Sequence, residues 1–89
     1  MGNFPGGSAY AMVRDVAEGF TMVTDRTFQR LLPPELDQLG FEIERYLREL
    51  RGDQPALDDL NAIQQKNRRI QRLNGCLMMM RSHRQRRRV

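Results

Sequence analysis

The sequence predicts an all-α protein built around an antiparallel helical hairpin, and three observations lead to this prediction. Apolar residues recur at steps of three, four or seven over much of the chain, which is the repeat of one helical face. Stop and start signals for helices lie near residues 33 and 52. Residues 56–89 contain no proline and one glycine, Gly75, as a long helix requires. At 89 residues the chain forms one domain at most.

We expect a flexible N-terminus over residues 1–8, a helical domain over 9–80 and a basic C-terminal tail over 81–89. Residues 9–32 form the first helical segment of this domain, but Gly19 weakens its middle. Asp25 offers a new N-cap, so two short helices with a kink near Thr24 are the alternative. Pro33 and Pro34 end the segment because the residue before a proline avoids the helical region.

Residues 34–51 predict the second helix with the clearest heptad pattern in the chain. Pro34 suits the first helical position, and Gly52 is the residue expected just past the end. The apolar positions step by three and four in the manner of a coiled-coil seam. They are Leu36, Leu39, Ile43, Tyr46 and Leu50.

The third helix is predicted over about residues 55–85. Asp53 or Gln54 can cap it, and the acids Asp58 and Asp59 complement its N-terminal dipole. Because the link from the second helix is short, the two helices should fold back antiparallel. The seam of the second helix would then pack against Leu60, Ile63 and Ile70. The segment 9–32 would fold over the remainder, which gives a loose three-helix arrangement.

An apolar collar is the first candidate functional feature. Residues 76–80 are apolar without interruption, so they wrap around a helix instead of lying on one face. The predicted second helix is too short to reach this region, and methionine adapts readily to partner surfaces. We therefore expect the collar to dock a partner protein or a second copy, with burial under segment 9–32 as the alternative. The collar consists of Leu73, Leu77, Met78, Met79 and Met80.

The basic C-terminal end is the second candidate feature. Residues 1–59 carry six arginines and eleven acids, a net charge of −5, whereas residues 60–89 carry nine basic residues and no acid, a net charge of +9. Such a tail can bind nucleic-acid phosphates, serve as a nuclear import signal or simply keep the chain in solution. A membrane-surface helix ranks third. The candidate residues are Arg81, Arg84, Arg86, Arg87 and Arg88.

Catalytic and metal chemistry lack candidate residues. His83 is the only histidine and lies among arginines, so we expect a solvated tail residue and no catalytic triad. Cys76 is the only cysteine, which leaves too few ligands for a zinc site and favours an intracellular location, in the nucleus or cytoplasm. We expect no cofactor, no small-molecule substrate and no transmembrane segment, since no run approaches the ~20 apolar residues of a span.

These observations favour a non-enzymatic helical adaptor or a small subunit of a multi-protein complex, docking through the apolar collar. The alternative is an arginine-rich protein that contacts nucleic-acid phosphates through residues 81–89. The sequence matches no family motif specific enough to name.

Overall fold

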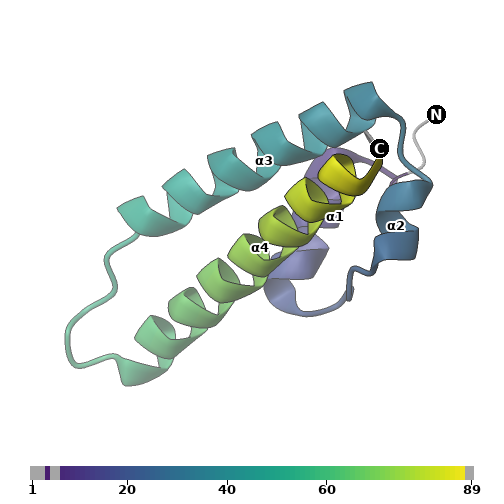
Figure 1. The fold of residues 1–89 in the computed structure, drawn as a ribbon. Helices are drawn as coiled ribbons and strands as arrows, with labels where there is room; N and C mark the ends of the chain where they lie inside the picture. Colours follow the sequence, from purple (N-terminus) through teal and green to yellow (C-terminus); the bar gives the residue numbers. More distant parts are fainter. Residues whose placement is uncertain (1–3, 5–6, 88–89) are drawn as a thin grey trace.

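The computed structural model describes residue 4 and residues 7–87, and in this part of the chain every regular element is a helix. The order is α1 (Ala9–Glu18), α2 (Asp25–Gln29), α3 (Pro33–Gly52) and α4 (Leu60–Arg87) (Figure 1). The all-α prediction with a long C-terminal helix is confirmed. The predicted flexible N-terminus is described only at Phe4, Gly7 and Ser8, of which Phe4 is buried in the core.

The segment 9–32 forms two short helices, which was the alternative predicted for it. Ser8 caps α1 by accepting a hydrogen bond from the Ala11 N–H at 3.1 Å. Gly19 ends α1 in the left-handed region, with φ +82°. The Phe20 N–H then donates to the Asp15 carbonyl at 2.8 Å, which satisfies a terminal carbonyl of the helix. The break therefore spans Gly19 to Thr24, and Thr24, one residue before the predicted Asp25, is the N-cap of α2.

The helix α3 begins at the predicted proline pair and keeps the predicted seam. Glu35 accepts a hydrogen bond from the Leu32 N–H at 2.8 Å, in the manner of a capping box. Leu36, Leu39, Ile43 and Leu50 are buried, and Tyr46 is partly buried against the core. The heptad pattern of α3 therefore correctly predicted which face of the helix is buried in the core.

The helix α4 begins at Leu60, later than the predicted start at residue 55. The Asp59 side chain accepts a hydrogen bond from the Ala62 N–H at 3.1 Å, so Asp59 caps the helix and Pro55 lies in the preceding loop. At its other end α4 continues to Arg87. Most of the predicted tail is thus helical.

The register of the hairpin differs from the expected one. Arg84 of α4 contacts Asp37 of α3 at 2.7 Å, and Arg81 contacts Glu44 at 3.7 Å. Because α3 and α4 run antiparallel, these contacts place Leu50 opposite the region of Leu73. The start of α4 consequently extends beyond the end of α3.

The exposure of Leu60 follows from this register. Leu60 is 67% exposed, and Ile63 and Ile70 are only partly buried, so the expected packing of the α3 seam on Leu60 is wrong. The loop over residues 53–59 is longer than the predicted link, and it separates the end of α3 from the start of α4. The partners of the α3 seam are the buried residues further along α4. They are Leu73, Cys76, Leu77 and Met80.

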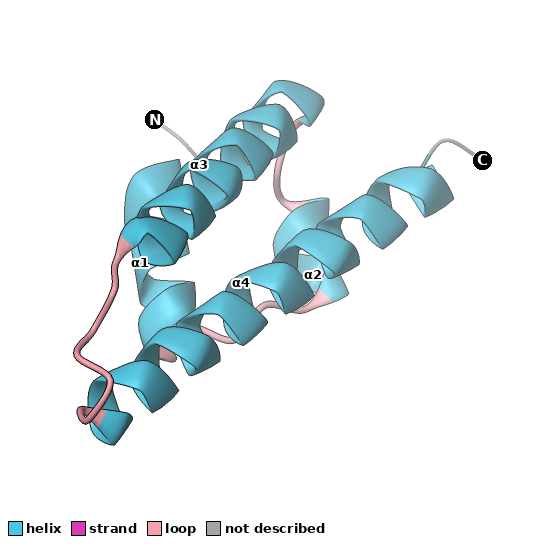
Figure 2. Ribbon diagram, turned by 90° about the vertical axis from the view of Figure 1, so that its left-hand side faces the viewer, coloured by secondary structure: helices cyan, strands magenta, loops and turns pink. Residues whose placement is uncertain are grey.

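The core is closed by α1 and α2 on one side of the α3–α4 pair. The helix α1 packs against both α3 and α4, and α2 packs against α4. Seen after a quarter turn, α1 and α2 lie behind the two long helices (Figure 2). No helix of the described part covers the opposite side of the pair. Cys76 lies within the core, and burial raises the pKa of its thiol to about 11, which opposes thiolate chemistry.

Two glycines give a matched test of the helix boundaries. A Cβ added at Gly75, inside α4, would meet nothing within 4 Å, so Gly75→Ala is expected to stabilise the protein by about 1 kcal/mol through helix propensity. Gly19→Ala should destabilise it, because Gly19 has φ +82° and its added Cβ would lie 3.0 Å from the Arg72 guanidinium carbon. Urea unfolding of both variants measures the two effects, and equal signs would contradict the boundary at Gly19.

Candidate interaction surface and basic cleft

The structure divides the predicted apolar collar between the core and the surface. Leu73, Leu77 and Met80 are buried within the chain's own core, so they offer little surface to a partner. Met78 and Met79 are 69% and 40% exposed. The division follows from the register, because α3 reaches the collar and covers one side of it. Of the five residues expected to dock a partner, two remain accessible.

The basic end of α4 is paired with acids from the first half of the chain. Arg84 contacts Asp37 of α3, and Arg86 contacts Asp25 of α2. Arg81 forms a longer pair with Glu44, and both of these side chains are well exposed. The side chain of Arg87 and all of Arg88 lie outside the described residues. Three of the five arginines predicted to bind phosphates or an import receptor therefore already face a carboxylate.

His83 is buried, contrary to the expectation of a solvated tail residue. It is 5% exposed, its Nδ1 lies 3.0 Å from Asp25 Oδ1, and its ring centroid is 5.9 Å from that of Phe28. The contacts with His83 first, and Arg86 second, lower the pKa of the Asp25 carboxyl from its usual 3.8. The helical path of α4 turns the His83 side chain inward, toward α2. Its contacts with Asp25 and Phe28 thus hold α2 against α4.

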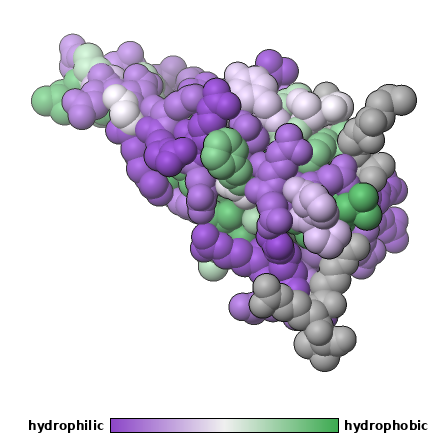
Figure 3. Space-filling model, turned by 90° about the horizontal axis from the view of Figure 1, so that it is seen from above, coloured by the Kyte–Doolittle hydropathy of each residue, from purple (hydrophilic) through white to green (hydrophobic). Residues whose placement is uncertain are grey.

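A groove follows the uncovered side of the α3–α4 pair. Two adjoining pockets of about 330 and 290 Å³ share Glu44 and Leu77, and all their lining residues come from α3 and α4. The groove floor includes Leu36, Leu47 and Met80, and Phe41, 59% exposed, stands at its edge. We call this feature the α3–α4 groove. Seen from above, the face of the molecule in view is mainly hydrophilic with separate hydrophobic spots (Figure 3).

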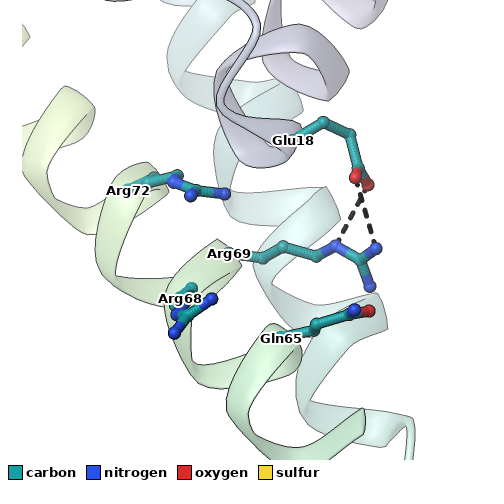
Figure 4. A pocket seen from close by; sticks show the side chains of 5 residues that line it. All are labelled: Glu18, Gln65, Arg68, Arg69 and Arg72. Atoms are coloured by element: carbon teal, nitrogen blue, oxygen red, sulfur yellow. Dashed lines mark hydrogen bonds and ion pairs between the residues drawn. The ribbon is translucent and has the colours of Figure 1, made fainter. Parts of the chain in front are cut away.

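A second cavity, of about 360 Å³, lies between the C-terminus of α1 and the first half of α4. Its lining is polar and comprises Glu18, Gln65, Arg68, Arg69 and Arg72 (Figure 4). Arg69 pairs with Glu18 through two contacts, at 3.0 and 3.2 Å. Arg72 donates to the Ala17 carbonyl at 2.9 Å. We call this feature the basic cleft.

The basic cleft was not predicted from the sequence. Its arginines belong to one face of α4, which a helical projection of the sequence displays. Nothing in the local pattern, however, indicates that Glu18 and Ala17 of α1 fold against that face. Tyr46 of α3 lies in the same neighbourhood: burial raises the pKa of its phenol, and the charge of Glu18 adds to the rise.

The described part of the chain forms neither a cluster of metal ligands nor a membrane-spanning helix. No group of three or more His, Cys, Asp or Glu side chains there is arranged to hold a metal ion. None of the described helices combines the length and apolar character needed to cross a bilayer. The described side chains supply surfaces and charge pairs.

Comparison with known proteins yields no relative. No family model, no curated protein and no solved structure matches the chain. A functional assignment must therefore come from the surfaces of the molecule itself.

Proposed function

We propose that this chain is a non-enzymatic helical interaction subunit that associates with a second copy of itself through the α3–α4 groove. The observation that carries the proposal is the continuous groove with an exposed aromatic side chain, Phe41, at its edge. Two-fold interfaces use the same patch on both copies, so the patch must offer both a projection and a hollow. Phe41 supplies the projection, and the two adjoining pockets of the groove supply the hollow.

The order of charges along α3 supports an antiparallel pairing. On α3, the acids Asp37 and Glu44 line the first part of the groove, and Arg48 and Arg51 line its last part. Arg84 and Arg81 of α4 line the first part too and pair with these two acids within the same copy. An antiparallel pairing of two copies brings the acidic part of each α3 toward the basic part of the other. Glu44 can take part because its own pair with Arg81 is 3.7 Å long and exposed.

The free energy expected for self-association favours a weak and reversible dimer. Aromatic side chains bury a large apolar area and are enriched at the centres of interfaces. A chain of this size has a small core, so association adds burial that the monomer lacks. Exposed charge pairs contribute about 0.2–1 kcal/mol each and set orientation more than affinity.

The test compares two phenylalanine variants by multi-angle light scattering across a concentration series. The wild-type chain is expected to reach twice the 10.5 kDa monomer mass at high concentration. Phe41→Glu should remain monomeric, because it places a charge where the second copy packs. Phe20→Glu is the matched control, since Phe20 is 80% exposed in the loop after α1 and lines neither pocket of the groove.

The outcomes separate the possible occupants of the groove. A wild-type chain that stays monomeric at all concentrations overturns self-association. Equal loss of the dimer in both variants would place the contact elsewhere. A monomer that binds an unrelated amphipathic helix, with loss only in Phe41→Glu, would assign the groove to a different protein and refute the second copy.

A further inference from the structure

We propose that the basic cleft binds a phosphate group carried by a small ligand. Three arginines and a glutamine converge on a cavity that contains one acid, Glu18. This inference is independent of self-association, because the cleft and the α3–α4 groove share no lining residue.

Two of the guanidinium groups are fixed in place by the end of α1. Glu18 holds Arg69 through two nitrogens, and the Ala17 carbonyl holds Arg72. Arg72 also approaches Gly19 so closely that a Cβ there would lie 3.0 Å from its guanidinium carbon. Positioned donors lose less conformational entropy on binding than free ones, so this arrangement favours a ligand.

The remaining donors are sufficient for an oxyanion. A guanidinium has five N–H donors, and the contacts with α1 use only part of those on Arg69 and Arg72. The Arg68 side chain lines the same cavity and makes no hydrogen bond or ion pair with another described residue. Figure 4 shows Arg68 and Arg72 on neighbouring turns of α4, with Gln65 below them. Planar guanidinium groups of this kind match phosphate oxygens in pairs.

The charge and the volume point to a small phosphorylated molecule. Three cations against one carboxylate leave the cleft net positive, so an anion entering it relieves repulsion between the arginines. A cavity of about 360 Å³ falls within the ~300–1,000 Å³ range of small-ligand sites. Its polar lining offers little to an apolar ligand.

Pyrophosphate is the probe, titrated into the full-length chain at constant ionic strength with NMR detection of the arginine Nε–H signals. Saturable shifts are expected at Arg68, Arg69 and Arg72. Arg68→Gln should weaken binding about tenfold, the loss of one charge-assisted contact. Glu18→Gln should strengthen binding about threefold, because it removes the competing negative charge while the amide oxygen can still accept a hydrogen bond from Arg69. Arg30→Gln, at an exposed position outside the cleft, should leave the affinity unchanged.

Opposite effects of the two cleft variants cannot arise from a general loss of folding. The Phe41→Glu variant should keep pyrophosphate binding, which separates this test from that of self-association. Sedimentation with phosphatidylcholine vesicles, with and without phosphatidylinositol phosphate, then tells whether a lipid headgroup or a free phosphate is the source. Absence of saturable shifts, weaker binding in Glu18→Gln, or equal weakening in Arg30→Gln and Arg68→Gln would overturn the site.

Discussion

Replacing Phe28 with alanine is expected to lower the free energy of unfolding by about 3–5 kcal/mol. Phe28 is fully buried and is the largest core side chain of α2, a helix of only five residues. So short a helix has no stability of its own, because helix nucleation is unfavourable. Phe28 packs beside His83, so its removal leaves a cavity between α2 and α4. Small domains have total stabilities of about 5–15 kcal/mol, and this variant would be close to unfolding.

Phe20→Ala is the control for this result. Phe20 is 80% exposed, so the same truncation should change stability by less than about 0.5 kcal/mol. Urea unfolding followed by circular dichroism gives both values. Equal stabilities of Phe28→Ala and Phe20→Ala would show that α2 does not dock on α4 through Phe28.

The parts of the fold that the sequence predicted are those set by local patterns. The proline pair at 33–34 and the heptad positions of α3 depend on neighbours a few residues away, and both appear at the predicted places. Gly19 was noted as a weak point, and its left-handed φ breaks the first helical segment there. Each of these signals acts within one or two turns of a helix.

The register of α3 against α4 could not be predicted in the same way. It depends on how far the loop over residues 53–59 extends and on charge pairs between residues distant in sequence, such as Arg84 with Asp37. Turn chemistry at Gly52 and Pro55 predicted a short link, whereas the loop runs over residues 53–59. A shift of a few residues along α4 decides whether Leu60 or Leu73 lies in the core.

The candidate sites depended on that register. His83 was read as part of a solvated tail because its neighbours in sequence are arginines, yet the helical path of α4 turns it toward Phe28. The acids that meet the basic end lie on α2 and α3, so only the folded chain brings them together. The charge asymmetry between residues 1–59 and 60–89 was visible in the sequence. In the folded chain much of it is neutralised by ion pairs between the two parts.

Leu73→Ala and Met78→Ala give the sharpest test of how the collar is divided. Both residues belong to the predicted collar on α4, but Leu73 is fully buried and Met78 is 69% exposed. Leu73→Ala should cost about 2–5 kcal/mol of unfolding free energy, through lost burial and the cavity left behind. Met78→Ala should cost less than about 0.5 kcal/mol, because its side chain is already in water.

Urea unfolding at a concentration where the chain is monomeric isolates these costs from association. If Leu73→Ala were harmless to the monomer and instead abolished the dimer, Leu73 would face a partner, as the sequence predicted. A large loss of monomer stability in Met78→Ala would likewise contradict its exposure. The expected pattern, with Leu73 stabilising the monomer, would mean that the apolar residues of α4 mainly hold the chain together. Association would then depend on the α3–α4 groove and Phe41.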